Sequence, residues 1–427
     1  MAKQLLAMDN NLNLWLETVD PSSRLVTKVQ VDGNTEASNW QALDANTIYV
    51  KGTDGNLWLE KGPFGQVPLP SCGSNNIQQQ NQCRIQVDAN VASVNNTSAY
   101  YGIYGPMGAP AGFCALDDNT VFVLGSDRKL WLEYGPFGQI PLPNQAPTLG
   151  PPRSCRFLID GNVINYQPIP SPVDDFYLSG QIYVLGFDGN LWLEWGPFYS
   201  GSSGRVLVDA NVLDFWAIDG NRCLVEGLDG NLWLEYGPFG QVPLPTFPTQ
   251  FPPALLPVGF SPFPPSARFQ VDGNVGFYTW LNENPNDRTD QVAVCGMDLN
   301  LWLEKGPFGQ VPPSRVQIDG NVGGVALPGW LGDVSSTSGD FLVLGWDQNL
   351  WWEIGPFGQV PLPQCNGPVS STSGCRTLID SNVDDCQVIP ETGYGTFLAA
   401  LTRRRSKAAF LRKKRAEKQE VRKSFPL

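Results

Sequence analysis

The chain has 427 residues, 42% of them hydrophobic, and 41 acidic against 28 basic residues give it a net charge of −13. It contains no histidine, which excludes a Ser-His-Asp or Cys-His catalytic system and a histidine-ligated zinc site. The acidic balance disfavours nucleic acid as a partner of the main domain. No apolar run approaches the roughly 18 residues of a membrane span.

The first expected elements are a strand at residues 5–8 and a second strand carrying Leu14-Trp15-Leu16-Glu17. This Leu-Trp-x-Glu core recurs, with its Trp at Trp15, Trp58, Trp131, Trp192, Trp233, Trp302 and Trp351. A second landmark, Asp-x-Asn followed by Val or Thr, starts at Asp32, Asp88, Asp160, Asp209, Asp272, Asp319 and Asp380. The landmarks alternate strictly, so a repeat architecture is predicted.

Each unit shows the period-2 pattern of β-strands. Residues 47–51 are rich in β-branched and aromatic side chains, and Asp54-Gly55-Asn56 is typical of a tight hairpin turn. Gly62-Pro63-Phe64-Gly65 ends the next strand, because proline lacks the ladder N–H. Further strands are expected at 84–88 and up to about residue 116. Seven units of four strands predict an all-β, seven-bladed β-propeller of four-stranded antiparallel blades; a β-helix fits less well, since its coils are shorter and lack hairpins.

The end of the chain leaves two interpretations open. An eighth copy of the hairpin's first strand occurs at 397–401 and then stops, so it either closes the ring on the first blade or marks an altered, longer repeat protein. Residues 403–427 carry eleven Lys and Arg. We therefore expect a propeller at 1–402 and a basic tail, helical or disordered, at 403–427. Residues 246–265 are rich in proline and are read as an extended interblade loop.

Nine cysteines give mixed evidence about the compartment. Cys72 and Cys83 bracket one loop, and Cys365 and Cys375 bracket the equivalent loop of the last unit, which predicts two loop-closing disulfides and an oxidising compartment. The N-terminus enters the first repeat without a signal-peptide pattern. The localisation is thus open between a cytoplasmic or non-classically released protein and an oxidising compartment.

Each unit also repeats one set of polar residues. An acid follows each Trp, and a cation lies four residues before each Asp, at Lys28, Arg84, Arg156, Arg205, Arg268, Arg315 and Arg376. These acids and cations form structural salt bridges, or they bind sugar hydroxyls while the indole packs on apolar C–H faces. The Trp itself is a pocket wall or a wedge between blades. Candidate ligand-binding residues are Trp15, Glu17, Trp58, Glu60, Asp88, Asn90, Trp131, Glu133, Asp160, Asn162, Trp192, Glu194, Trp233, Glu235, Trp302, Glu304, Trp351 and Glu353.

These Leu-Trp hairpins resemble the repeats of tachylectin-like and tectonin-type β-propeller lectins, across roughly residues 4–401. The resemblance implies binding of small sugars in pockets between adjacent blades. The Gly-Pro-Phe-Gly-Gln-Val-Pro-Leu-Pro extension is not part of that pattern. Asp-Gly-Asn-Leu-Trp also resembles the repeat of virginiamycin B lyase-like propellers, whose elimination chemistry uses a histidine and a divalent metal; without histidine, that activity is not carried over.

The sequence therefore favours a multivalent carbohydrate-binding propeller that is not an enzyme, has no cofactor and no metal, and recognises glycans on cell surfaces or glycoproteins. Its oligomeric state is left open. A protein-interaction scaffold that uses the face loops is the alternative. A carboxylate-based hydrolase or lyase is a third interpretation, with Asp174-Asp175 or Asp384-Asp385 as the hint of an extra acid pair.

Overall fold

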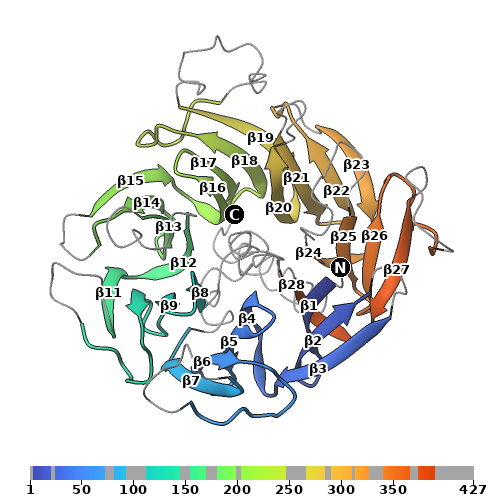
Figure 1. The fold of residues 1–427 in the computed structure, drawn as a ribbon. Coiled ribbons are helices and arrows are strands. Elements are labelled where there is room, and N and C mark those ends of the chain that lie inside the picture. The colour runs from blue at the N-terminus through green and yellow to red at the C-terminus, as the bar shows by residue number, and fades with distance from the viewer. Residues whose placement is uncertain are drawn as a thin grey trace, which may run out of the picture.

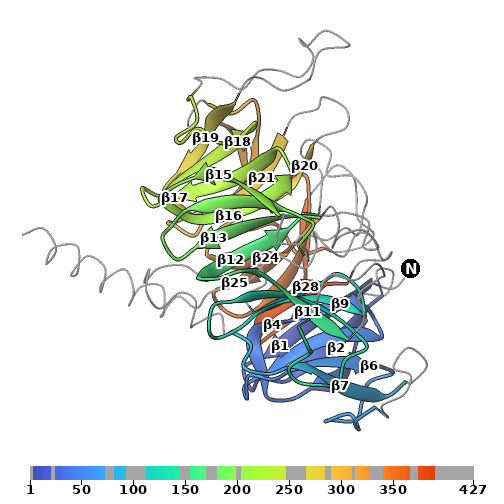
Figure 2. The same cartoon turned by 90° about the vertical axis from the view of Figure 1, so that its left-hand side faces the viewer.

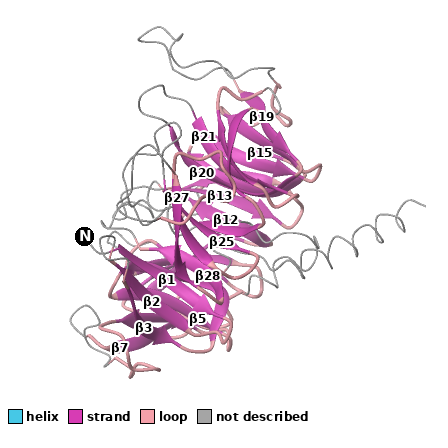
Figure 3. Cartoon of the chain, turned by 90° about the vertical axis from the view of Figure 1, so that its right-hand side faces the viewer, coloured by secondary structure: helices cyan, strands magenta, loops and turns pink. Residues whose placement is uncertain are grey.

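A computed structural model describes residues 3–20, 25–72, 81–92, 112–144, 154–169, 180–198, 203–246, 266–283, 290–309, 313–326, 340–365 and 374–389. These residues form seven four-stranded antiparallel sheets arranged around a central axis (Figure 1). No helix occurs in the described ranges, and every element there is a strand or a connection (Figure 3). The predicted seven-bladed β-propeller is confirmed.

Each blade runs from an inner strand to an outer strand. Blade 1 consists of β28 (Val383–Val388), β1 (Lys3–Asp9), β2 (Leu14–Val19) and β3 (Val26–Asp32). Blade 2 has β4 (Thr35–Asp44), β5 (Thr47–Gly52), β6 (Leu57–Lys61) and β7 (Cys83–Asp88), and blade 3 has β8 (Phe113–Ala115), β9 (Thr120–Leu124), β10 (Leu130–Tyr134) and β11 (Cys155–Asp160). Blade 4 has β12 (Val163–Pro168), β13 (Gln181–Gly186), β14 (Leu191–Trp195) and β15 (Gly204–Asp209), and blade 5 has β16 (Val212–Asp219), β17 (Arg222–Gly227), β18 (Asn231–Tyr236) and β19 (Ala267–Gly273). Blade 6 has β20 (Val275–Glu283), β21 (Asp290–Gly296), β22 (Leu301–Lys305) and β23 (Ser314–Asp319), and blade 7 has β24 (Val322–Ala326), β25 (Asp340–Gly345), β26 (Leu350–Ile354) and β27 (Cys375–Asp380).

The ring is closed by a strand from the end of the chain. β28 pairs with β1, with Leu5 opposite Val388 and Ala7 opposite Cys386. Blade 1 therefore combines one C-terminal strand with three N-terminal strands, and β1 and β28 lie side by side near the marked N-terminus (Figure 1). The expected closing segment at 397–401, the boundary at 402 and the basic tail at 403–427 lie outside the described residues, as do Asp174-Asp175 and residues 247–265.

The hydrophobic core lies between the blades. Tyr49, Leu57 and Leu59 of blade 2 are buried in one cluster with Phe113 and Phe137 of blade 3. Phe137 belongs to a Gly-Pro-Phe segment, and the phenylalanines of the other such segments also pack in interblade clusters. Since burying one such side chain contributes about 1.5–3 kcal/mol, stacking of the blades is what stabilises each sheet (Figure 2).

The Gly-Pro-Phe-Gly extensions become straps on the outer edge of the ring. In four blades the residue after Pro-Leu-Pro forms a parallel bridge with the outer strand at its arginine: Ser71 with Arg84, Asn144 with Arg156, Thr246 with Arg268 and Gln364 with Arg376. A strap of this kind satisfies backbone groups of an edge strand that would otherwise be exposed.

Both predicted disulfides, Cys72–Cys83 and Cys365–Cys375, are present, and they indicate an oxidising compartment. Cys155, Cys223 and Cys295 are buried and belong to neither disulfide. Among the described residues, no helix has the length and apolar character needed to cross a membrane.

Candidate ligand site between blades

The repeated polar residues gather on one face of each blade. In blade 2, Trp58 and Glu60 project from the same face of β6, because they are two residues apart on one strand. β7 places Gln86 opposite Trp58 and Arg84 opposite Glu60. The other face of β6 carries Leu57 and Leu59, which belong to the core. The polar set therefore faces the preceding blade.

An arginine covers the Trp in six of the seven blades. The guanidinium carbon of Arg84 lies 4.3 Å from the centroid of the Trp58 ring, a cation–π arrangement. The equivalent pairs, all within 4.1–4.5 Å, are Arg156 on Trp131, Arg205 on Trp192, Arg268 on Trp233, Arg315 on Trp302 and Arg376 on Trp351. These Trp side chains are partly exposed, so they lie beneath an arginine at the surface and are not wedges of the core.

The glutamates are buried beside an aspartate of the preceding blade. Burial raises the pKa of Glu60 to about 8, and the negative charge of Asp32 from blade 1 acts in the same direction. The positive charge of Arg84 lowers this pKa but does not outweigh burial. The same arrangement raises the pKa to about 8 for Glu133 and Glu194 and to about 9 for Glu304 and Glu353. Burial raises the pKa of Glu235 well above its usual range. The partners of Glu133, Glu194, Glu235, Glu304 and Glu353 are Asp88, Asp160, Asp209, Asp272 and Asp319.

The Asp-x-Asn segments form the turns that connect the blades. All seven Asn residues have positive φ, for example 58° at Asn90 and 57° at Asn162, a conformation that Asn tolerates. Asp88 accepts a hydrogen bond from the amide of Ala89 through one carboxylate oxygen. Asp88 and Asn90, two of the candidate ligand-binding residues, thus lie at the end of blade 2, and Asp88 lies beside Glu133 of blade 3.

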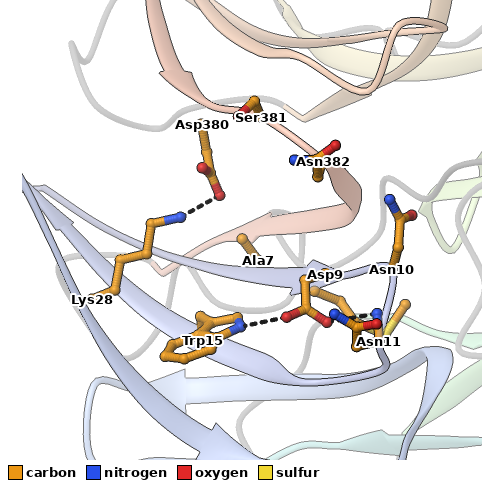
Figure 4. Close-up of a pocket in the computed structure, with 10 residues that line it drawn as sticks. Ala7, Asp9, Asn10, Asn11, Trp15, Lys28, Asp380, Ser381 and Asn382 are labelled. Atoms are coloured by element: carbon orange, nitrogen blue, oxygen red, sulfur yellow. Dashed lines mark hydrogen bonds and ion pairs between the residues drawn. The ribbon is translucent and has the colours of Figure 1, made fainter.

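The junction between blades 7 and 1 contains a pocket of about 370 Å³. Its walls come from the end of β1 and the following turn, from β2 and β3, and from the turn after β27 (Figure 4). The lining residues are Ala7, Met8, Asp9, Asn10, Asn11, Trp15, Lys28, Asp380, Ser381 and Asn382. Of the sequence candidates, the pocket contains Trp15, with Glu17 bonded to one of its lining residues.

Lys28 occupies the arginine position in blade 1, but it points elsewhere. Its Nζ lies 2.9 Å from Oε1 of Glu17 and 2.5 Å from Oδ2 of Asp380, and in Figure 4 it extends toward Asp380 and away from the Trp15 ring. Burial opposes the charged form, but these hydrogen bonds raise the pKa of Lys28. Burial, against the hydrogen bond from Lys28, raises the pKa of Glu17 to about 7.

Asp9 fixes the indole of Trp15. The Nε1–H of Trp15 donates to Oδ2 of Asp9 at 3.1 Å, and the amides of Asn11 and Asn13 donate to Oδ1 at 2.8 and 3.0 Å. Burial opposes ionisation, but these bonds lower the pKa of Asp9, so this edge of the pocket carries a negative charge. The other six blades have glycine at this position: Gly52, Gly125, Gly186, Gly227, Gly296 and Gly345.

The absence of a strap in blade 1 explains why this junction is open. A Cβ placed on Gly33 would lie 3.6 Å from Cγ1 of Val67, which belongs to the strap of blade 2. Gly320 has the same relation to Val360 of blade 7. The connection from β2 to β3 in blade 1, residues 20–25, contains no Gly-Pro-Phe segment in its sequence, so the described part of blade 1 offers no equivalent of Val67 or Val360 to Ser381.

Sequence reasoning did not single out Asp9, Asn10, Asn11, Asp380, Ser381 and Asn382 as ligand-binding residues, although it placed Lys28 and Asp380 in the repeat. The available signals were departures from the repeat: a lysine among six arginines, an aspartate among six glycines, and a blade with no Gly-Pro-Phe-Gly. Averaging the repeat into a consensus concealed them.

No protein-family model matches the chain, and no curated protein matches it by sequence. Solved structures of similar fold include a lectin of Burkholderia pseudomallei, with 14% identity, 86% of this chain and 94% of that chain covered, and a TM-score of 0.44. The periplasmic gluconolactonase of Pseudomonas aeruginosa has 12% identity, with 92% and 100% covered and a TM-score of 0.44. The structure of Kap60 bound to yeast RCC1 has 10% identity, with 98% and 93% covered and a TM-score of 0.41. These similarities concern the fold alone.

The expectation that the chain is not an enzyme was wrong as an inference from its architecture. A gluconolactonase, which is an enzyme, is among the propellers of similar fold. The lack of histidine still excludes the catalytic systems that require one, but it leaves carboxylate chemistry available.

Proposed function

We propose that the propeller binds carbohydrate and that the pocket between blades 7 and 1 is a binding site. The observation that carries the proposal is the half-buried indole of Trp15, which lines a cavity whose other walls supply carboxylate, amide and hydroxyl groups. An aromatic face suits the C–H face of a sugar ring, and the polar groups suit its hydroxyls. The volume, about 370 Å³, is near the lower end of the range for small-ligand sites.

Multivalent binding is the wider form of this proposal. Six further Trp–Glu sets repeat around the ring, but in each of them a sugar would have to displace a guanidinium from the indole. We therefore expect the pocket of blade 1 to fill first, and any avidity to come from weaker occupation of the other junctions. Calorimetric stoichiometry with a single sugar distinguishes one site from several.

A glycan array with the full chain tests the proposal, followed by titration of the hits against two variants. Trp15→Ala removes the indole of the pocket, and Trp233→Ala is the matched control, since Trp233 lies beneath Arg268. We expect Trp15→Ala to weaken binding by roughly tenfold or more and Trp233→Ala to leave it nearly unchanged. If the folded chain ignores every glycan, the proposal is wrong; an equal loss in both variants would move the binding away from this single pocket.

A protein-interaction scaffold is the second candidate, and the straps favour it. Val67 and Val360 lie on the straps of blades 2 and 7, and each is 37% exposed. A disulfide closes the loop that follows each of these straps. Binding that depends on the straps would be lost in Val67→Asp or Val360→Asp and kept in Trp15→Ala, which is the opposite of the pattern expected for the sugar pocket.

A further inference from the structure

We propose that the pocket between blades 7 and 1 selects a sugar that carries a positively charged ammonium group. The ammonium would take the place over Trp15 that an arginine takes over Trp in the other six blades. This inference rests on the proposed carbohydrate function, and it names the class of sugar.

The ring provides its own comparison for this site. In blades 2 to 7 a guanidinium carbon lies 4.1–4.5 Å from the centroid of the Trp ring. The strand register of blade 1 is the same, because Trp15 is opposite Gln30 and Glu17 is opposite Lys28. A cation beside the Trp of such a blade is thus attracted to the indole face, as expected from the quadrupole of the ring.

Blade 1 has the same strand register, but its cation, Lys28, does not lie over the Trp ring. Nζ of Lys28 lies 2.9 Å from Glu17 of its own blade and 2.5 Å from Asp380 across the junction, so its charge is directed toward these two carboxyl groups. The indole of Trp15 consequently lines the pocket (Figure 4), and the site is left to a cation from a ligand.

The missing strap does not explain why Lys28 leaves the Trp15 ring open while arginines cover the other six Trp rings. Blade 4 has a shortened connection after Gly196-Pro197-Phe198, and a Cβ on Gly161 at that junction would have no atom within 4 Å. Even so, Arg205 lies 4.5 Å over Trp192 with its side chain 56% exposed. An open junction alone therefore leaves the cation on the indole. Arg315 also lies near two carboxyl groups and still covers Trp302, so we attribute the face of Trp15 that no described cation covers to lysine in place of arginine.

Asp9 makes the indole a better cation site. Its carboxylate accepts the Trp15 Nε1–H, which holds the ring in place and adds negative charge at its edge. In the other blades a side chain at this position would meet the turn aspartate, because a Cβ on those glycines would lie 2.3–2.7 Å from its Oδ1. Blade 1 has Asn11 where they have that aspartate, so the negative charge is transferred from the tip of the turn to the pocket.

The charge balance of the pocket favours an ammonium and opposes a carboxylate. Asp9 and Asp380 line the pocket with one cation, Lys28, so an acidic sugar would add a further negative charge to an acidic site. A hexosamine with a free amine offers both a C–H face and a cation. Its N-acetylated form offers the C–H face without the cation, and comparing the two isolates the charge.

The experiment is a calorimetric titration of the full chain with glucosamine, N-acetylglucosamine and glucuronate. It is run at about pH 6, where a sugar amine is protonated, in low and in near-physiological salt. We expect glucosamine to bind roughly five- to thirtyfold more tightly than N-acetylglucosamine, and glucuronate to bind most weakly.

Lys28→Arg is the decisive variant, because it restores the residue that covers Trp in the other blades. It should reduce glucosamine binding at least as strongly as Trp15→Ala, and Arg268→Lys in blade 5 is the matched control that should leave it unchanged. Equal or tighter binding of N-acetylglucosamine would overturn this inference and leave the carbohydrate function standing. The inference would also be overturned if glucosamine still bound to Trp15→Ala and this binding disappeared in salt. Such a result would indicate diffuse electrostatic attraction to an acidic protein. If no sugar binds the folded chain, the proposed function itself fails.

Discussion

Glu60 of blade 2 lies beside Asp32 of blade 1, and both side chains are buried at the junction, with exposed fractions of 0% and 5%. Neither carboxyl oxygen of Glu60 has a hydrogen-bond partner in the described part of the chain. Arg84 lowers the pKa of both acids, but burial outweighs it. The relation recurs around the ring, so each junction contains two acids and one cation.

The stability of the ring should fall as the pH rises from about 5 to 9. The pKa of Glu60 is about 8 in the folded ring, against 4.5 for an ordinary glutamate such as that of the unfolded chain. Its contribution to the free energy of unfolding is therefore complete below pH 4.5 and is lost as the pH rises through the folded pKa. Glu304 and Glu353, with pKa values of about 9, extend the window upward. Melting temperatures measured across this range check the sign; a steady increase toward pH 9 would contradict it.

Glu60→Gln should reduce this pH dependence. The amide has nearly the shape of the carboxyl group and cannot ionise, so the variant should be more stable than the parent at about pH 9, by about 1–3 kcal/mol. Urea unfolding at pH 5 and pH 9 measures both values. Equal urea midpoints for variant and parent at high pH would show that Glu60 carries no buried charge there.

Arg315→Ala should destabilise the junction between blades 5 and 6. NH1 of Arg315 lies 3.6 Å from Oδ2 of Asp272 and 3.7 Å from Oε1 of Glu304, and its guanidinium covers Trp302 at 4.3 Å. We expect a loss of about 2–4 kcal/mol in the free energy of unfolding, since two acids lose their cation and the indole loses its cover. The double variant with Glu304→Gln should recover part of it; full additivity would argue against a coupled cluster.

Ring closure should depend on residues 383–388 and not on the basic tail. A chain ending at Thr402 retains β28, and we expect its melting temperature to match that of the full chain. A chain ending at Asn382 leaves β1 without its inner neighbour, which exposes an unpaired strand edge and should cause cooperative unfolding or aggregation at ordinary temperatures. Size-exclusion chromatography and thermal melting of the two chains compare these outcomes directly. Equal behaviour would refute closure through β28.

Each disulfide should stabilise the ring modestly. Cys72–Cys83 and Cys365–Cys375 close segments with sequence separations of 11 and 10, for which the loss of chain entropy in the unfolded state corresponds to about 2–3 kcal/mol. Unfolding of Cys72→Ser/Cys83→Ser in denaturant, with and without a reductant, measures the first bond separately from the second. Insensitivity of the parent protein to reductant would show that these bonds contribute little.

The sequence alone determined the blades. Alternating strands, Asp-Gly-Asn turns and seven equivalent copies are local features, and each copy can satisfy its hydrophobic face only by stacking on another, so a ring of seven was the consistent solution. It also predicted both disulfides, because Cys72 and Cys365 have the same place in their units.

Only the tertiary structure decided how the repeated side chains meet. Glu60 and Asp88 belong to the same repeat unit, yet Glu60 lies beside Asp32 of the preceding blade, since the face that carries Trp58 and Glu60 is turned toward that blade. The same packing places Arg84 on Trp58. At the junction where β28 pairs with β1, Lys28 instead bonds to Asp380, a residue 352 positions later in the sequence, and Trp15 lines a pocket.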